Sequence, residues 1–309
     1  MKKIVVTGGS GVIGKELIKL LLKDNSNILN IDTTEILDKT IQSHPNYKYL
    51  QQDISKLNDK TLLDYRPNEI YHLAAVFERT EESASHFNNN YISNISATHN
   101  LLKISSNIES LKKFIFASSY LVYDSNLYMF QNPDNKTKYL NEGDAKSPRN
   151  LTGYSKYYNE KELRFMFKNH TSVDYISARI FRGYGIGSKD FISRTIDNLI
   201  NNRKIEIYNS EGAFDYLYSK DAATGLKKLS EIGYSGEVNL GAGKSRSINS
   251  VLSEIEKVFG KFEYSKISRS EIGYENSASD NTLLESLIGW KPDYGFSNSI
   301  SDLFNQYDN

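Results

Sequence analysis

The chain opens with the stretch KIVVTGGSGVIG at residues 3–14, where a short apolar run leads directly into a glycine-rich turn. Gly8, Gly11 and Gly14 stand at the spacing G-x-x-G-x-x-G, and apolar residues recur at helical spacing from Ile13 onward. Glycines at these points permit a tight turn, a close approach of the backbone to a pyrophosphate, and close packing of strand and helix. The stretch predicts a strand, a turn and a helix that together bind a dinucleotide.

An acidic residue follows at the distance that this interpretation requires. The strand predicted at residues 27–31 leads into Asp32, eighteen residues after Gly14. A carboxylate there accepts hydrogen bonds from both ribose hydroxyls of an adenosine and repels the additional phosphate of NADP. Glycine turns also occur for structural reasons alone, but the strand, helix and acid together favour the dinucleotide, and no arginine follows in residues 33–35. NAD is the predicted cofactor.

Composition excludes several other classes of function. The 309 residues carry 38 basic and 38 acidic side chains, so no charge excess favours a nucleic acid or a membrane surface as partner. Cysteine is absent, and the five histidines have no partner at metal-ligand spacing, so we expect no disulfide and no metal site. The first strand begins at residue 3, which leaves no room for a signal peptide. A cytoplasmic protein is expected.

Apolar runs alternate with helical patterns through the first half, which indicates a Rossmann-type α/β fold with a doubly wound parallel sheet. We predict an NAD-binding domain at 1–178 and a smaller lobe, mainly for substrate, at 179–309, of which about 214–245 returns to the first domain. Later strands are expected at 47–51, 69–73, 113–117 and 173–180, and helices at 94–107, 155–168, 191–200 and 248–259, with a small helical element at 283–290 closing the chain. The polar segment 124–149 shows no periodicity and is expected to form a lid or a substrate loop.

Further candidate cofactor contacts follow the third and fourth strands. Asp53 follows the third strand, where a side chain could meet the adenine. The small side chains of Ala74 and Ala75 would let the backbone lie close to the cofactor, whereas His72 is interpreted as a packed strand residue. Arg79 follows closely enough that it could face the cleft.

The chain resembles the extended short-chain dehydrogenase/reductase family, specifically its NAD-dependent nucleotide-sugar epimerase/dehydratase branch. The resemblance extends over nearly the whole chain in order. It rests on residues 7–14, Asp32, Asp53-Ile54, His72-Leu73-Ala74-Ala75, Asn94, Ser118-Ser119, Val122-Tyr123, Ser155-Lys156, residues 179–187, residues 215–218, Asp221, Asn239-Leu240-Gly241 and Gly289-Trp290-Lys291-Pro292. It implies an enzyme of surface-polysaccharide biosynthesis that forms a transient ketone on a nucleotide sugar, and a homodimer built on the helices at 94–107 and 155–168.

The resemblance also implies roles for individual residues. Lys156 would bind the nicotinamide ribose and lower the pKa of a neighbouring hydroxyl, and Ser119 would hydrogen-bond the reacting oxygen of the substrate. Together with the residues argued above, the predicted cofactor site comprises Gly8, Ser10, Gly11, Val12, Ile13, Gly14, Asp32, Asp53, Ile54, Leu73, Ala74, Ala75, Asn94, Lys156 and Arg182.

One departure concerns the catalytic hydroxyl. Most relatives carry a tyrosine four residues before the lysine, one helical turn away, where this chain has Thr152. An alkyl hydroxyl is several pKa units more basic than a phenol, so Thr152 is a poor general base. Tyr154 could replace the tyrosine if the backbone before Ser155 is not helical. Tyr120 or Tyr123 could also supply a phenol, or a water or substrate group could occupy the space.

A second departure concerns the substrate anchor. Relatives often carry an arginine at the position of Phe214 and another shortly before the late aspartate, here Asp280; both are missing. Possible substitutes are Arg182, which precedes a glycine-rich loop at a strand end, and Lys189, Arg194 and Arg246. The two departures leave two alternatives open: a net NAD-dependent dehydrogenase on another polar substrate, or a catalytically degraded NAD-binding partner or sensor protein.

Overall fold

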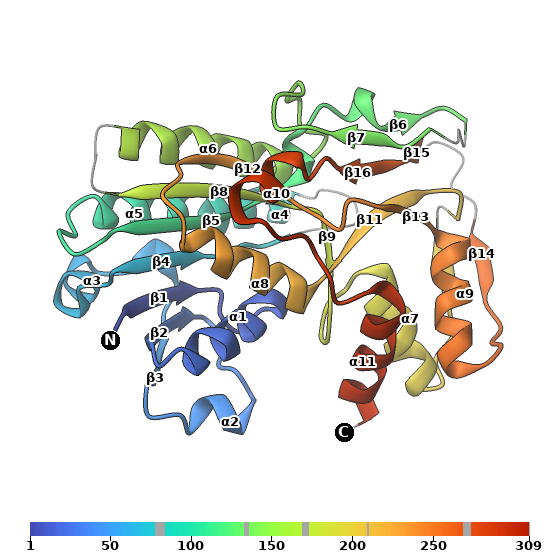
Figure 1. Cartoon of the computed structure of the whole chain (residues 1–309), viewed down its shortest axis with the longest axis horizontal. Helices are drawn as coiled ribbons and strands as arrows, with labels where there is room; N and C mark the ends of the chain where they lie inside the picture. Colours follow the sequence, from blue (N-terminus) through green and yellow to red (C-terminus); the bar gives the residue numbers. More distant parts are fainter. Residues whose placement is uncertain (78–83, 133–135, 169–172, 209, 268–272, 309) are drawn as a thin grey trace.

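Seven parallel strands form the central sheet of the computed structural model, in the order β12-β8-β5-β4-β1-β2-β3 (Figure 1). They are β1 (Lys3–Thr7), β2 (Asn27–Asp32), β3 (Tyr47–Gln51), β4 (Glu69–His72), β5 (Lys113–Ser119), β8 (Asp174–Ile180) and β12 (Gly236–Leu240). The order runs outward from β1 in both directions, so the carboxyl ends of β1 and β4 form the crevice in which such sheets bind ligands. The predicted doubly wound Rossmann sheet is confirmed. The structure describes residues 1–77, 84–132, 136–168, 173–208, 210–267 and 273–308, and Arg79 lies outside them.

Both faces of the sheet are apolar because alternate strand residues point to opposite sides. Val6 packs in one core with Leu17 of α1, and Val5 packs in the other core with Leu101 of α5. The helices of the first face include α1 (Val12–Lys23), α8 (Ser219–Ser230) and α10 (Thr282–Ile288); those of the second include α3 (Asp59–Tyr65), α5 (Ala97–Ser105) and α6 (Leu151–Lys168). The return of α8 and β12 to this sheet brings residues 219–240 beside the cofactor half.

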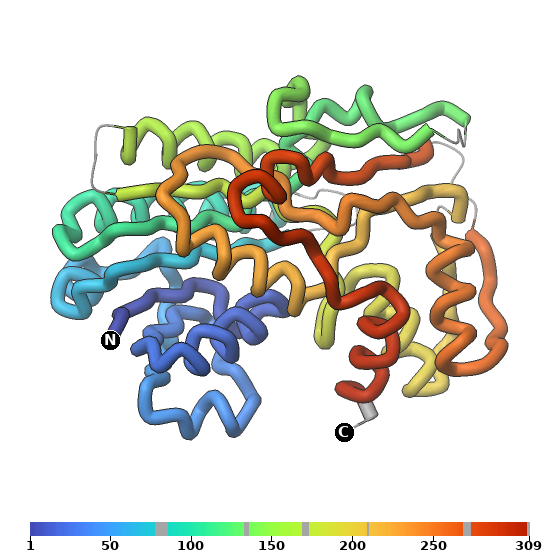
Figure 2. Tube along the Cα trace, in the orientation of Figure 1, coloured from blue at the N-terminus to red at the C-terminus, as the bar shows by residue number. Residues whose placement is uncertain are grey.

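A second core lies at the other end of the molecule and is built from shorter elements. Its helices are α7 (Phe191–Ile200), α9 (Ile248–Phe259) and α11 (Phe296–Asp308), and its strands include β9 (Arg182–Tyr184), β11 (Ala213–Tyr218) and β13 (Ser245–Ser247), with β10 (Glu206–Tyr208) beside β14 (Ser265–Ile267). Figure 2 shows the red C-terminal segment running from α10 down to α11. Two short pairs, β6 (Met129–Phe130) with β15 (Tyr274–Glu275) and β7 (Lys138–Leu140) with β16 (Ser277–Ser279), give structure to the segment predicted as a lid or loop.

Two helix starts differ from the prediction, and one further helix follows the expected last element. The helix expected from Asn94 begins at Ala84, as α4 (Ala84–Asn90), and continues through a π-helical turn, η2 (Tyr91–Ser96), into α5. Its asparagine-rich start has low helix propensity and is instead supported by tertiary contacts of buried side chains such as Asn94. The helix expected from Ser155 begins at Leu151, and α11 follows the small element that was expected to close the chain. In the described part of the chain, no helix has the length and apolar character needed to cross a bilayer.

Candidate functional site

The glycine turn after β1 is fixed by two positions that only glycine can fill. Gly8 has φ of 70°, and a Cβ there would lie 2.5 Å from the backbone nitrogen of Ala74. A Cβ on Gly14 would lie 2.6 Å from the Cα of Gly9. Any side chain at Gly8 would push the turn away from the segment after β4, and any side chain at Gly14 would push the helix away from the turn. The tight turn predicted for Gly8 and the close packing predicted for Gly14 are therefore confirmed.

The second glycine of the motif faces the space where a phosphate would lie. Gly11 is the N-cap of α1 and supplies no side chain to bond the amides of the first turn, which are those of Val12, Ile13 and Gly14. A Cβ on Gly11 would meet one neighbouring atom, the Gly8 oxygen at 3.2 Å, and would otherwise project into open space. Free amides and the positive end of the helix dipole fit a pyrophosphate at this point.

A pocket of about 310 Å³ lies beside this turn, at the carboxyl ends of β1, β2 and β4. Its walls are Gly8, Ser10, Gly11, Asp32, Thr33, Thr34, Gln52, Asp53, Ile54, Leu73, Ala74, Ala75, Val76, Ser93 and Ala97. Nine of these were predicted to bind the cofactor. Of the other predicted contacts, the residues 12–14 present amides at the helix start, whereas Asn94, Lys156 and Arg182 do not line this pocket. The other six lining residues were not predicted as cofactor contacts, because their side chains carry no motif: Thr33, Thr34, Gln52, Val76, Ser93 and Ala97.

Asp32 presents a carboxylate to the pocket in a fixed orientation. One oxygen accepts a hydrogen bond from the Ser10 amide at 3.0 Å, and the other accepts from the Thr34 amide at 3.3 Å. Each oxygen retains a lone pair for a ribose hydroxyl, since a carboxylate has about four acceptor positions. The side chain is half-buried, so it can reach a ligand.

Asp53 and Asn94 support the walls of the pocket. Asp53 caps a short helix, because its carboxylate accepts a hydrogen bond from the Ser55 amide at 2.9 Å. Asp53 also lines the pocket. Asn94 is buried and makes a pair of hydrogen bonds with the backbone of Val76, at 2.8 and 2.9 Å. Asn94 therefore positions the loop after β4, and its amide is not free to reach a cofactor directly.

Lys156 and Thr152 lie on one buried face of α6, one helical turn apart. The Lys156 ammonium lies 4.6 Å from the centroid of the Phe116 ring, in the middle of β5, where Phe116 pairs with His72 at the end of β4. Burial lowers the pKa of Lys156 to about 8, although Glu160 one turn further along opposes the shift. The Thr152 hydroxyl is buried and finds no hydrogen-bond partner in the part of the chain that the structure describes. The site thus holds an amine that is partly neutral near pH 8 beside an unused hydroxyl.

Each tyrosine considered as a replacement is turned to the surface or engaged in other contacts. Because α6 is already helical at Leu151, Tyr154 is turned by about 200° from Lys156 and is 54% exposed; the hypothesis of a non-helical backbone there is wrong. Tyr120 stacks on Phe181, with ring centroids 5.1 Å apart, and burial raises its pKa, which disfavours a phenolate.

Tyr123 is also committed elsewhere. Its hydroxyl donates to the Asn239 side chain at 2.6 Å and accepts from Arg179 at 3.2 Å. Ser119, by contrast, is half-buried at the end of β5, and within the described ranges its hydroxyl accepts one hydrogen bond, from the nearby Leu121 amide at 3.2 Å. Of the predicted catalytic residues, Ser119, Thr152 and Lys156 are therefore the ones whose side chains are neither turned to the surface nor engaged with other aromatic or polar groups at a distance from α6.

His72 is a packed residue, as the sequence indicated. Thr98 donates its hydroxyl proton to the Asn94 carbonyl at 2.7 Å, so it accepts from His72 Nε2 at 2.8 Å. Nδ1 then accepts from the Thr7 hydroxyl at 2.7 Å. Burial and the positive charge of Lys156 lower the pKa of His72 to about 3, so the ring is neutral.

A buried ion pair lies next to the face of α6 that carries Lys156. Arg179 of β8 binds Glu160 through two parallel hydrogen bonds of 2.9 and 2.8 Å, and both side chains are at most 2% exposed. Glu160 also accepts from the Ser118 hydroxyl at 2.6 Å. The pair was missed at the sequence level, because its partners are nineteen residues apart on different elements. The pair holds the Glu160 carboxylate in place, and the negative charge of that carboxylate raises the pKa of Lys156 against the effect of burial.

Two arginines share one carboxylate beyond the end of β8. Arg149 and Arg182 each bind Glu275 of β15, at 2.8 and 3.0 Å. Burial would raise the pKa of Glu275, but the two guanidinium groups outweigh it and lower the pKa to about 2. Of the other cations considered as anchors, Lys189 and Arg194 are exposed and Arg246 lies over the Phe296 ring. The carboxylate at Glu275 was not anticipated from the sequence.

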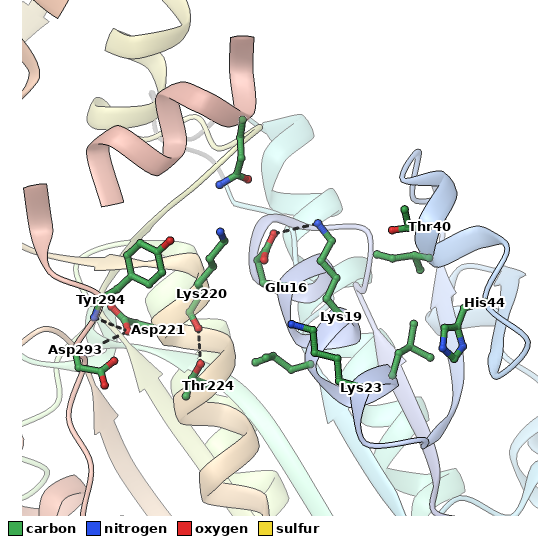
Figure 3. A pocket seen from close by; sticks show the side chains of 14 residues that line it. Glu16, Lys19, Lys23, Thr40, His44, Lys220, Asp221, Thr224, Asp293 and Tyr294 are labelled. Atoms are coloured by element: carbon green, nitrogen blue, oxygen red, sulfur yellow. Dashed lines mark hydrogen bonds and ion pairs between the residues drawn. The ribbon is translucent and has the colours of Figure 1, made fainter. Parts of the chain in front are cut away.

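A larger hollow of about 710 Å³ lies elsewhere, between α1, α2 (Lys39–Gln42), α8 and the C-terminal segment (Figure 3). None of Ser119, Thr152 and Lys156 lines it. Two of its lysines are paired within the protein, Lys19 with Glu16 and Lys220 with Asp302. Among the described residues no group of three histidines, cysteines or acidic side chains could hold a metal ion. The larger hollow therefore does not compete with the dinucleotide pocket as the site of chemistry.

A Rossmann sheet, a dinucleotide pocket and a buried lysine at its edge define the class of NAD-dependent enzymes that transfer hydride. The chain belongs to the NAD dependent epimerase/dehydratase family, whose profile matches residues 4–241. NAD is accordingly its cofactor.

Individual relatives are similar over almost their whole length. The chain is 28% identical to a UDP-glucuronate 4-epimerase of Thermodesulfobacterium geofontis, covering 97% of this chain and 94% of that protein. It is 24% identical to a human dTDP-D-glucose 4,6-dehydratase, covering 99% and 90%. A solved UDP-N-acetylglucosamine 4-epimerase from Methanobrevibacter ruminantium M1, in complex with UDP-N-acetylmuramic acid, superposes with a TM-score of 0.86 at 25% identity, covering 99% and 98%. The relatives are thus nucleotide-sugar epimerases and dehydratases.

We expect Asp32→Asn to weaken the preference for NAD over NADP. The substitution keeps the shape of the side chain but removes the charge that binds the ribose hydroxyls and repels a 2′-phosphate. Hydrogen bonds to charged groups contribute about 1.5–3 kcal/mol, so the ratio of the two dissociation constants should fall by about 10- to 100-fold. Calorimetric titration measures it, and Asp64→Asn, on the exposed surface, is the charge-matched control. An unchanged ratio would remove Asp32 from the cofactor site.

Proposed function

We propose that this protein modifies a nucleotide-activated sugar through a transient ketone. NAD, when bound, supplies reversible hydride transfer. The ketone acidifies the adjacent C–H bond, so that epimerisation, dehydration or decarboxylation can occur before the hydride returns. The observation that carries the proposal is the buried Lys156 over Phe116, which pairs with His72 at the carboxyl end of β4, next to the Leu73 wall of the dinucleotide pocket. On the family resemblance alone, we assign the product to surface-polysaccharide biosynthesis.

The proton of the substrate hydroxyl leaves, in this proposal, through Thr152 to Lys156. The Thr152 oxygen accepts the substrate proton as its own proton passes to the neutral amine, so the threonine never becomes an alkoxide. This route uses the two groups that share the buried face of α6 and avoids the several pKa units that a free alkyl hydroxyl would require. Ser119 donates a hydrogen bond to the same substrate oxygen and orients it.

The test is product formation with a defined set of substrates. The protein with NAD is incubated in D₂O with UDP-glucose, UDP-glucuronate, UDP-N-acetylglucosamine or dTDP-glucose, and the nucleotide sugars are analysed by mass spectrometry and NMR. We expect an isomer, a dehydrated product or carbon-bound deuterium with at least one of them. A steady gain of NADH would instead indicate a net dehydrogenase. Absence of all three outcomes would favour an NAD-binding partner protein, the alternative that Thr152 motivates.

We also propose that two copies of the chain associate through the helices at 94–107 and 155–168, as the resemblance implies, and that η2 and the start of α6 extend this surface. These neighbouring elements expose large apolar side chains, namely Tyr91, Ile92, Tyr154, Tyr158 and Phe165, whose exposed fractions range from 47% to 74%. A second copy would cover these side chains by placing the same helices against each other. Light scattering coupled to size-exclusion chromatography measures the mass directly, and the mass of a single chain at micromolar concentration would contradict the dimer.

A further inference from the structure

Arg182 lies over Phe214, the position at which the family resemblance would place an arginine. Its guanidinium carbon lies 3.8 Å from the centroid of the Phe214 ring. The two side chains come from hydrogen-bonded neighbours, because β9 pairs with β11 and Arg182 stands opposite Tyr216. The positive charge missing from β11 is therefore supplied from β9, and the Phe214 ring supports it through a cation–π contact.

Several donors around this arginine have no acceptor within the described part of the chain. The Nε of Arg182 and the hydroxyls of Tyr128 and Tyr216 are buried and unpartnered. A buried donor without an acceptor is costly, so such groups are normally paired unless a ligand completes them. Arg149 and Arg182 remain 25% and 32% exposed, whereas Glu275 between them is 2% exposed. The carboxylate thus lies behind two guanidinium groups that still reach solvent.

The pair lies at the end of the site where the sugar would react. In the sheet, Ser119 is paired with Ile180, and Arg182 follows two residues later, within about 7 Å along the chain. On the other side Arg149 precedes Thr152 by three residues. Both cations are therefore tied to the backbone that carries the candidate reacting groups, which places them near the sugar ring.

The net charge of the group formed by Arg149, Arg182 and Glu275 indicates which ligand it binds. Two cations around one carboxylate leave one positive charge, which one oxyanion neutralises, and guanidinium groups bind carboxylates through parallel hydrogen bonds. We propose, building on the proposed function, that Arg182 and Arg149, held by Glu275, bind a carboxylate on the sugar, so that the substrate is a nucleotide-activated acidic sugar. The diphosphate of the nucleotide is the other oxyanion with the same chemistry, and the test separates the two.

The test compares three ligands in the protein saturated with NAD. UDP carries only the phosphates, UDP-glucose adds a neutral sugar, and UDP-glucuronate adds the carboxylate. Calorimetry should show UDP-glucuronate binding about 10- to 100-fold more tightly than UDP-glucose, and Arg182→Met should abolish that difference while UDP binds as before. Arg203→Met is the matched control, because Arg203 pairs with Asp197 on the surface with its side chain 60% exposed. NAD affinity and circular dichroism report folding, and Arg149→Met takes over the test if Arg182→Met does not fold.

Each other outcome overturns the assignment. An equal loss of affinity for all three ligands in Arg182→Met would show that the guanidinium binds the diphosphate. Equal affinity of the unmodified protein for UDP-glucose and UDP-glucuronate, or an unchanged preference in Arg182→Met, would show that these arginines do not recognise the sugar. Failure of the unmodified protein to bind any of the three would reject the nucleotide-sugar function itself, together with the acidic sugar.

Discussion

Replacing Lys156 by methionine is expected to lower turnover by about 10²- to 10⁴-fold, because the variant loses the proposed acceptor of the substrate proton. Methionine keeps much of the length and apolar stem of lysine, so the buried face of α6 should remain packed. Turnover is measured on the nucleotide sugar that gives product, with NAD saturating. Lys156→Arg is the informative companion, because arginine keeps the positive charge but cannot lose its proton. Substantial turnover in Lys156→Arg would show that the charge alone is needed.

The same assignment fixes the direction of the pH dependence. Burial lowers the pKa of Lys156 to about 8, and the amine accepts a proton only in its neutral form. The value of kcat/KM should therefore rise about tenfold per pH unit up to about pH 8 and level off above it. This rise of kcat/KM with pH should be absent in Lys156→Met.

Thr152→Val separates the relay from the lysine. The substitution keeps the branched shape and removes the hydroxyl that has no hydrogen-bond partner among the described residues. Turnover should fall in Thr152→Val and recover largely in Thr152→Ser, while NAD affinity stays the same in both. Full activity of the valine variant would remove Thr152 from the proton route.

The second large effect concerns stability. Arg179→Met is expected to lower the free energy of unfolding by about 3–5 kcal/mol, because it leaves the Glu160 carboxylate buried without its cation. The pair is tied by two short hydrogen bonds and is almost fully buried, so water cannot replace the guanidinium. Urea titration followed by circular dichroism measures the change. Arg203→Met, which breaks an exposed pair, should change stability little, and equal effects of the two substitutions would contradict this account.

The sequence was most informative where backbone geometry forces a residue type. Gly8 and Gly14 have neighbours so close that a Cβ is excluded, and such positions are recognisable in sequence because only glycine fits. Strand positions such as Val5 and Val6 were equally recognisable, since both faces of a parallel sheet are buried.

Sequence reasoning failed where distant side chains decide. The start of α6 before Ser155 could not be predicted from local propensity, because Gly153 lies within its first turn and packs against the Leu121 carbonyl. The placement of Tyr154 on the exposed side follows from that boundary. The carboxylate that joins Arg149 to Arg182 belongs to Glu275, which is more than ninety residues away along the chain from either arginine. Contacts of this kind carry no periodic signal.

The exchange between Arg182 and Phe214 bears on how such chains are sorted into active and inactive groups. An alignment that compares single positions counts the missing arginine at position 214 as a loss of function and groups the chain with pseudoenzymes. Here the guanidinium of Arg182 reaches the Phe214 ring from the adjacent strand β9, so one of the two missing positive charges has a substitute at another point of the chain. Searches for pseudoenzymes would misclassify fewer chains if they compared which charged groups lie in each part of the site, and not only which residue stands at each aligned position.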